Sequence, residues 1–207
     1  MKIAVFVSGG GTNLQAIIDN IRNGYLQDIE ITLVVSSNPE AYALTRAKEN
    51  NIPTTVLSVK DYADRIVWDE AVLTAVEESG AELIVLAGYL SLLGTMVVHT
   101  YSNRIINIHP ALIPSFCGNG MYGIKPHEAA LARGVKVSGA TVHFVNENYD
   151  EGPIILQKAV DVLPGDTPEV LQLRIMEQCE QVILPKAIRL IADGKVTIEN
   201  NIATVRE

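Results

Sequence analysis

Short apolar runs alternate with segments of helical periodicity along the first half of the chain. The strand-like runs are residues 3–7, 29–35, 54–57 and 82–87, and the helical segments are residues 14–21, 41–49 and 61–78. Runs that are apolar at nearly every position suit parallel strands that are covered on both faces. The alternation therefore predicts a Rossmann-like α/β protein, with a mostly parallel twisted sheet and helices on both faces.

The second half opens with another apolar run at residues 105–109 and then changes character. Residues 110–125 contain several glycines without periodicity, which predicts a long loop, and long loops in compact domains are usually functional or mobile. A short helix (127–132), two strands (139–145 and 154–162) and a long final helix that Thr167 caps complete the pattern. We expect an antiparallel edge near the C-terminus, and a single domain over 1–207 with halves 1–100 and 101–207.

The totals narrow the class of protein. A chain of 207 residues, 48% of them hydrophobic, suits one α/β domain with a sizeable core. The net charge of −8 argues against nucleic acid as a partner, and no apolar run approaches the length of a membrane span. Two distant cysteines without metal-ligand spacing fit a reducing cytosol. We expect a cytoplasmic protein without a metal, either a monomer or a homodimer.

The run at 105–109 ends in Asn107-Ile108-His109-Pro110. Side chains alternate across a strand, so Asn107 and His109 share one face, roughly 7 Å apart. They stand at the carboxyl end of the strand, where open α/β sheets bind ligands. An amide and a protonated imidazole can both stabilise an oxyanion, and a nearby Asp150 would favour the charged imidazole. The alternative is a polar pair that only caps a loop.

Residues 8–14, Ser-Gly-Gly-Gly-Thr-Asn-Leu, join the first strand to the first helix. Glycines let backbone amides approach an anion, and the helix directs its positive end at the ligand. The turn therefore predicts a phosphate site with Thr12 and Asn13 as side-chain donors. It is not a dinucleotide fingerprint, because Leu14 holds the third glycine position, and it is not a P-loop. A tight turn without a ligand is the alternative.

The final helix carries one charge in its apolar stripe. The stripe consists of Leu173, Met176, Glu180, Ile183, Ala187 and Leu190. A carboxylate at such a position should be paired or should face a ligand, unless it lies at an exposed edge of the stripe. Pro185 predicts a kink nearby.

Among the other histidines, we predict His99 and His127 to be solvent-exposed and His143 to be structural.

Five segments of the chain resemble the phosphoribosylglycinamide formyltransferases, folate-dependent enzymes of purine synthesis. They are VSGGGTNLQAII (7–18), VLAGY (85–89), NIHPALIP (107–114), GATVHFV (139–145) and DEGPIILQ (150–157), in the order of that family. The resemblance implies transfer of a formyl group from 10-formyltetrahydrofolate to N1-(5-phosphoribosyl)glycinamide on the route to IMP. The products would be N2-formyl-N1-(5-phosphoribosyl)glycinamide and tetrahydrofolate.

The resemblance also assigns roles to individual residues. The catalytic trio would be Asn107, His109 and Asp150, supported by Thr141 and His143. The ribonucleotide contacts would be Gly11, Thr12, Asn13, Glu177, Gln178, Cys179 and Glu180. The folate contacts would be Arg65, Leu90, Ser91, Leu92, Leu93, Val98, Ile105, Asn107, Asn146, Glu147, Asn148, Tyr149 and Asp150. Ser91 stands where the family commonly has a basic folate contact, and the loop 115–125 is longer than usual.

Three other interpretations remain open from the sequence. A methionyl-tRNA formyltransferase would need a basic tRNA-binding extension, and the acidic chain ends without one. A formyltetrahydrofolate hydrolase usually carries an amino-terminal regulatory domain, whereas here the first strand begins at residue 2. A nucleotide-binding module without catalysis is the third, and the combination of Asn107, His109 and Asp150 argues against it.

Overall fold

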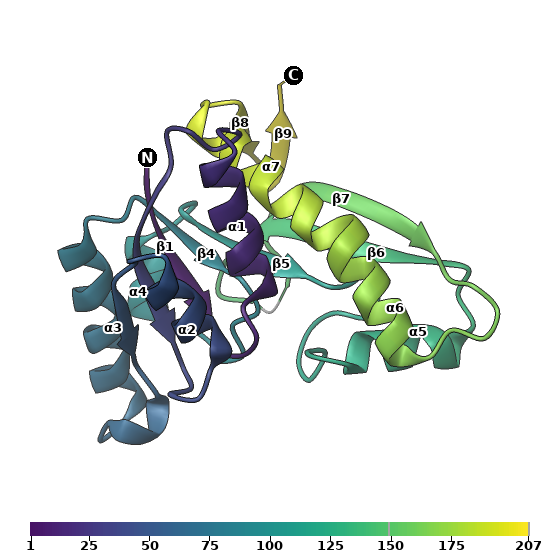
Figure 1. Cartoon of the computed structure of the whole chain (residues 1–207), viewed down its shortest axis with the longest axis horizontal. Coiled ribbons are helices and arrows are strands. Elements are labelled where there is room, and N and C mark those ends of the chain that lie inside the picture. Colours follow the sequence, from purple (N-terminus) through teal and green to yellow (C-terminus); the bar gives the residue numbers. More distant parts are fainter. Residues whose placement is uncertain (149, 207) are drawn as a thin grey trace. The chain divides into compact units, whose positions relative to one another are not determined.

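The computed structural model describes residues 1–148 and 150–206, in two compact units, Met1–Ile106 and Asn107–Glu207 (Figure 1). The first unit contains β1 (Lys2–Val7), α1 (Thr12–Arg22), β2 (Glu30–Ser36), α2 (Tyr42–Glu49), β3 (Thr54–Val56), the 3₁₀ turn η1 (Val59–Asp61), α3 (Arg65–Ser79), β4 (Leu83–Leu86) and α4 (Thr95–Thr100). The strand β5 (Ile105–His109) begins in this unit and ends in the second.

Strand β1 forms the centre of the sheet in the first unit. It pairs in parallel with β2 on one side and β4 on the other, and β2 pairs in parallel with β3. All five residues from Ile3 to Val7 are fully buried, so both faces of the strand are covered. The burial of both faces therefore explains why this run of the sequence is apolar at every position.

The second unit continues from β5 with α5 (Lys125–Arg133), β6 (Val137–Phe144), β7 (Ile154–Asp161), α6 (Pro168–Ile175), the π-helical turn η2 (Met176–Glu180), α7 (Gln181–Ala192), β8 (Val196–Glu199) and β9 (Ile202–Val205). Strands β6 and β7 are antiparallel, and β7 is an edge of the seven-stranded sheet, whose order is β3-β2-β1-β4-β5-β6-β7. The predicted α/β class, with a mostly parallel sheet and an antiparallel edge, is confirmed. The division into functional halves stays a prediction.

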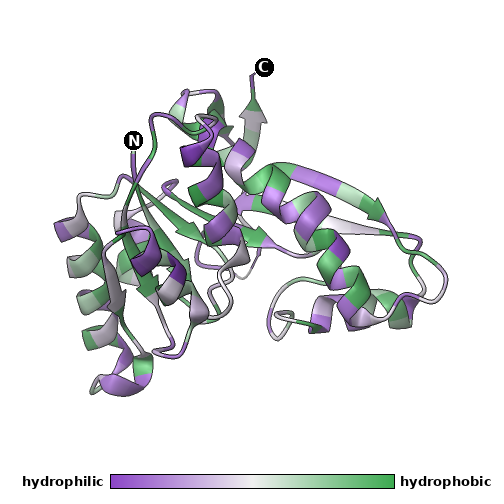
Figure 2. Cartoon of the chain, in the orientation of Figure 1, coloured by the Kyte–Doolittle hydropathy of each residue, from purple (hydrophilic) through white to green (hydrophobic). Residues whose placement is uncertain are grey.

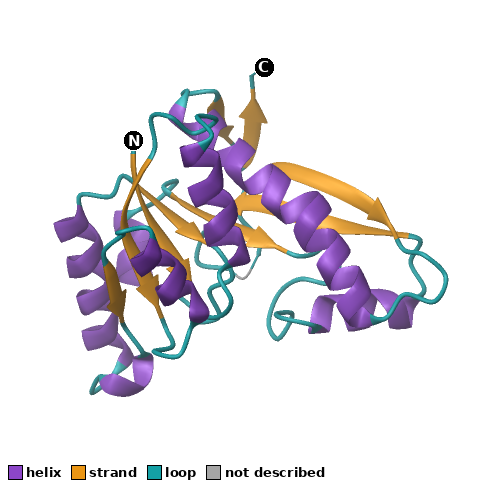
Figure 3. Cartoon of the chain, viewed as in Figure 1, coloured by secondary structure: helices purple, strands orange, loops and turns teal. Residues whose placement is uncertain are grey.

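The hydropathy of β7 changes along the strand in step with its burial. Its first residues are apolar and partly covered, its middle residues Gln157 and Lys158 are polar, and Figure 2 shows this change along the ribbon. Helix α7 contacts both β6 and β7, and α6 contacts β6 (Figure 1). The connection between β5 and α5 is almost entirely irregular, which confirms the predicted loop (Figure 3).

Three elements differ from the sequence-based expectation. Helix α4 was not predicted; the buried Asp69 caps it by accepting hydrogen bonds from the Gly94 and Met96 amides at 3.0 and 2.9 Å. The β8–β9 hairpin was also missed, because it is short and only partly buried. The final helix is interrupted at η2, before Pro185, which lies within α7. Within the described residues, no helix combines the length and apolar character of a membrane span.

Candidate active site

Asn107, His109 and Asp150 lie together in the second unit. Asn107 and His109 end β5, and Asp150 belongs to the loop between β6 and β7. The Asp150 carboxylate places Oδ2 3.6 Å from His109 Nδ1, and its Oδ1 accepts a hydrogen bond from Asn107 Nδ2 at 3.5 Å. The predicted juxtaposition of an amide, an imidazole and a carboxylate is therefore present. Their catalytic roles stay predictions.

The second nitrogen of His109 fixes its tautomer. Nε2 lies 2.9 Å from the Phe116 carbonyl oxygen, which can only accept, so Nε2 carries a proton. Nδ1 then faces the Asp150 carboxylate, and a proton there would lie between imidazole and carboxylate. Phe116 and Asp150 have φ angles of 52° and 54°, in the left-handed region that bulky residues rarely occupy. Strain of this kind is concentrated at functional sites.

His143 joins the trio from β6. Its Nδ1 donates to the Phe144 carbonyl at 2.8 Å, and its Nε2 lies 3.2 Å from Asn107 Nδ2. The same Nε2 lies 3.4 Å from Asp150 Oδ1. The expectation that His143 is merely structural was therefore too narrow, because the side chain contacts two members of the trio.

Thr141 holds the segment that follows Pro110. Its hydroxyl donates to the Ala111 carbonyl at 2.7 Å and accepts from the Ile113 amide at 3.1 Å. Gln157 also donates to this oxygen, at 3.0 Å. Thr141 thus supports the site through the backbone.

Burial and neighbouring charges shift the pKa values of this cluster in opposite directions. Burial lowers the pKa of His109 overall, although the Asp150 carboxylate and the Phe116 carbonyl raise it. Burial alone would raise the pKa of Asp150, but the His143 hydrogen bond, the His109 charge and the Gly118 amide outweigh it and lower the pKa. Asp150 is therefore ionised at neutral pH. Asp150 favours the charged form of His109, as expected, but desolvation by burial exceeds this effect, so the net pKa of His109 is lowered.

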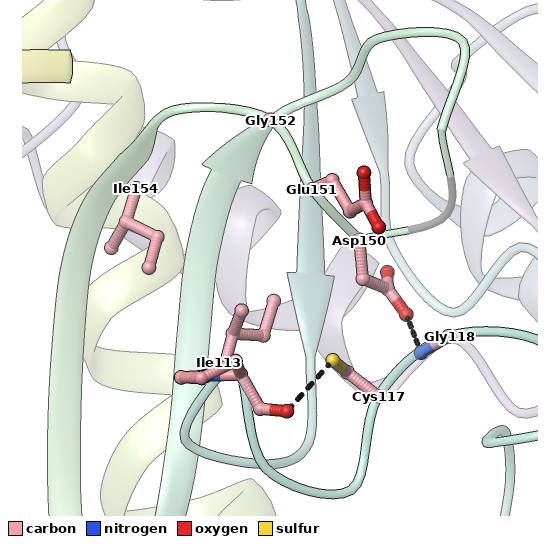
Figure 4. Close-up of a pocket in the computed structure, with 8 residues that line it drawn as sticks. Ile113, Cys117, Gly118, Asp150, Glu151, Gly152 and Ile154 are labelled. Carbon is pink, nitrogen blue, oxygen red and sulfur yellow. Dashed lines mark hydrogen bonds between the residues drawn. The ribbon is translucent and has the colours of Figure 1, made fainter. Parts of the chain in front are cut away.

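A cavity of about 450 Å³ opens beside Asp150 (Figure 4). It is lined by Ile113, Pro114, Cys117, Gly118, Asp150, Glu151, Gly152 and Ile154. Asp150 Oδ2 accepts from the Gly118 amide at 2.8 Å, which ties the two loops that form the walls. Burial raises the pKa of the Cys117 thiol, and the carboxylates of Asp150 and Glu151 raise it further, so the thiol is protonated. The cavity combines apolar side chains with the carboxylates of Asp150 and Glu151.

The sequence analysis did not predict two backbone groups that form hydrogen bonds in this cluster. The Phe116 carbonyl and the Gly118 amide are backbone groups of an irregular loop, and no residue type in the sequence indicates that they contact the site.

His127 was predicted to be solvated, and this is wrong, because it is 1% exposed. Burial, followed by the charge of His109, lowers its pKa to about 4. The sequence did contain a signal for this burial, because His127 and Ala130 are three residues apart and so lie on the same face of α5, which is buried.

The Gly-rich turn is preserved in the first unit. Gly11 has a φ of 71° and precedes the first residue of α1, so the turn needs a glycine there. The Ser8 hydroxyl lies 2.6 Å from that of Ser37 and accepts from the Leu90 amide at 2.9 Å, which links the turn to the segment after β4. Phosphate binding by Gly11, Thr12 and Asn13 stays a prediction.

The remaining ribonucleotide candidates occupy η2. Cys179 is fully buried and Glu180 is 8% exposed, whereas Glu177 and Gln178 lie on the more open side of the turn. A π-helical turn is often found at functional sites. The alternative of an exposed stripe edge does not hold for Glu180, because the side chain is buried.

The folate candidates divide by exposure. Arg65 donates to the Leu92 carbonyl at 2.6 Å and stacks over Trp68, so it holds the 90–93 segment. Leu90 and Leu92 are exposed, but Leu93, Val98 and Ile105 are buried. Asn146 accepts from the Asn148 amide at 3.0 Å, Glu147 is exposed, and Tyr149 lies outside the described residues. The roles of all these residues stay predictions.

Comparison with known proteins places this arrangement in a family. The family described as formyl transferase matches residues 1–188. A phosphoribosylglycinamide formyltransferase from Haemophilus influenzae is 38% identical over 202 residues, covering 98% of this chain and 92% of the relative. This chain belongs to the phosphoribosylglycinamide formyltransferase family. The predicted family is confirmed.

Other members extend the comparison. The crystal structure of glycinamide ribonucleotide transformylase 1 from Symbiobacterium toebii matches with a TM-score of 0.94 at 41% identity, covering 100% of this chain and 94% of the other. The human trifunctional purine biosynthetic protein adenosine-3 is 40% identical over 97% of the chain. The chain spans 19% of the length of that larger protein.

Proposed function

We propose that this chain transfers a formyl group from 10-formyltetrahydrofolate to the amine of N1-(5-phosphoribosyl)glycinamide, in the synthesis of IMP. The observation that carries the proposal is the cluster at the end of β5, where Asp150 lies 3.6 Å from His109 Nδ1 and accepts from Asn107. Family membership supports small-molecule substrates and a folate-derived donor. We expect the enzyme to act in the cytoplasm, as a monomer or homodimer without a nucleic-acid partner.

In the proposed reaction, the neutral amine attacks the formyl carbon and the carbonyl oxygen becomes an oxyanion. Asn107 and protonated His109 stabilise that charge, which is worth about 3–4 kcal/mol for each well-placed donor. The new C–N bond forms at the substrate amine, and the bond to N10 of the folate breaks. The proton lost by the amine reaches N10, with Asp150 and a water as the relay.

Because burial lowers the pKa of His109, the protonated form that the reaction needs must be favoured by negative charge close to the imidazole. A developing oxyanion beside the imidazole favours the charged form, as the Asp150 carboxylate already does. In the structure, the Phe116 carbonyl is the acceptor at Nε2. We expect the formyl oxygen to take the place of that carbonyl, with movement of the loop that carries Phe116.

The other predicted contacts complete the substrate sites. Gly11, Thr12 and Asn13 would bind the phosphate, and residues 177–180 would hold the rest of the ribonucleotide. The donor would contact Arg65, the segment 90–93, Val98, Ile105 and residues 146–150. The serine at position 91 leaves contact with the glutamate tail of the donor to other groups.

A spectrophotometric assay with both substrates, each omitted in turn, tests the proposal. Formation of tetrahydrofolate should require both substrates, and His109→Ala should lose most of the rate. His99→Ala is the matched control, because His99 is an exposed histidine on α4. Donor consumption without the ribonucleotide would identify a hydrolase instead. Inactivity with both substrates, despite binding of a phosphate ligand, would favour a module without catalysis.

A further inference from the structure

Helix α2 holds the Gly-rich turn from behind. The Ala43 amide donates to the Gly9 carbonyl at 3.1 Å, and Arg46 Nε donates to the Gly10 carbonyl at 2.9 Å. Gly11 packs so closely on this helix that a Cβ added to it would lie 2.6 Å from Cβ of Ala43. Two consecutive carbonyl groups of the turn are therefore drawn toward α2.

This arrangement determines where the amides of the turn point. A trans peptide group directs its C=O and its N–H to opposite sides, and the peptide bonds that join these glycines are trans. When the carbonyls of Gly9 and Gly10 face α2, the N–H groups of Gly10 and Gly11 face away from it. Successive amides that point to one side, followed by a residue in the left-handed region, form an anion-binding concavity. Gly11 supplies that conformation with its φ of 71°.

Arg46 is itself held in place by two further groups. Its Nη1 donates to Oε1 of Gln15 on α1 at 3.1 Å, and its guanidinium lies 5.0 Å from the centre of the Tyr42 ring. The side chain therefore connects α2, the turn and α1 through one rigid planar group. A lysine could supply the charge but not both hydrogen bonds, since its ammonium is a single point at the end of a flexible chain.

We propose that Arg46 is a positioning residue for phosphate recognition, which fixes the Gly10–Gly11 peptide so that the Gly11 amide faces the ligand. The guanidinium also adds a positive charge behind the turn, which favours a phosphate dianion. The inference rests on the proposed function, because it takes the phosphate of the ribonucleotide as the ligand of this turn.

The test compares Arg46→Met and Arg46→Lys with the control Lys48→Met, which removes a positive charge from an exposed position of the same helix. Methionine keeps the aliphatic packing against Gly11 and removes the donors. Affinity for inorganic phosphate is measured by calorimetry, and KM for each substrate and kcat are measured by the two-substrate assay. Thermal unfolding reports whether each variant is folded.

Arg46→Met should weaken phosphate binding and raise the ribonucleotide KM by about tenfold to a hundredfold, as expected for loss of a hydrogen bond from a charged group. The folate KM and kcat should stay within about twofold of the wild type, because Arg46 does not touch the reacting atoms. Arg46→Lys should recover part of the affinity, and Lys48→Met should match the wild type.

An effect of Arg46→Met no larger than that of Lys48→Met would overturn the proposal. A uniform loss in kcat and in both KM values would also overturn it, since a general structural defect would then explain the result. If Arg46→Met does not fold, Arg46→Lys decides by the same measurements. A wild-type chain that binds phosphate but does not formylate the ribonucleotide would refute the proposed function, while the phosphate affinities would still test Arg46.

Discussion

Replacement of His127 by leucine should remove a large part of the acid sensitivity of the fold. The imidazole is 1% exposed, and neither ring nitrogen has a hydrogen-bond partner among the described residues. Its pKa falls from 6.5 to about 4, chiefly by burial and then through the charge of His109. The folded chain therefore holds His127 neutral at a pH where the unfolded chain already protonates it.

The pKa difference gives the sign and size of the effect. A pKa that is lower in the folded state means that the unfolded state binds the proton first, so stability falls as pH drops from about 6.5 toward 4. The full difference of about 2.5 pKa units corresponds to an upper limit of about 3.4 kcal/mol, at about 1.36 kcal/mol per unit. About 2.5 kcal/mol of this is lost by pH 4.5, and none above pH 7.5.

Urea unfolding of the wild type and His127→Leu at pH 7.5 and pH 4.5 measures this contribution. Leucine fills the site without buried polar atoms, so the variant should be close to the wild type at pH 7.5. At pH 4.5 it should be more stable than the wild type by about 2–3 kcal/mol. The other titrating groups are common to both chains, and the difference between the chains therefore reports His127 together with its smaller coupling to His109. His99→Gln should keep the wild-type dependence, and the same dependence in His127→Leu would refute the reasoning.

Three further changes test the site and its supports. Asp150→Asn removes the charge that favours protonated His109, so kcat should fall by about a hundredfold or more while calorimetry finds nearly unchanged ribonucleotide affinity; the opposite pattern would exclude the assigned role. Asp69→Ala leaves two backbone amides at the start of α4 uncapped and should cost about 2–3 kcal/mol in urea unfolding; an unchanged midpoint would contradict this. Gly152→Ala would place a Cβ 1.8 Å from the Phe144 carbonyl oxygen, so the loop that carries Asp150 must shift and kcat/KM should drop sharply, and full activity would show that the loop adapts.

The sequence predicted the sheet well because its strands are buried on both faces. The run from Ile3 to Val7 has no polar residue, and such a run has few alternatives in an α/β protein. Helix α4 was not predicted because the residue that caps it, Asp69, lies 27 residues away in the sequence from the Met96 amide that it accepts from. The hairpin β8–β9 was missed because each strand is only four residues long and is at most partly buried.

The candidate site was predictable in its residue types but not in its finer geometry. Asn107 and His109 share a strand face by elementary alternation, and a resemblance to a known family supplied Asp150. No local rule indicates that Phe116 adopts a positive φ and offers its carbonyl to His109. The exposure of His127 was mispredicted because a polar residue type was given more weight than its position on the buried face of α5.

The π-helical turn η2 has a consequence for comparison of chain lengths within the family. A π turn accommodates one residue more than an α-helical turn, and each residue of an α-helix advances the side chains by about 100°. Deletion of one residue from Met176–Glu180 would therefore convert this turn to a regular α-helical turn, and α7 would keep its buried face, which includes Ile183, Leu184 and Ala187, against β6 and β7. A one-residue gap in this stretch of an alignment is compatible with unchanged packing of α7, whereas a one-residue gap within α7 itself would rotate the side chains beyond it by about 100°.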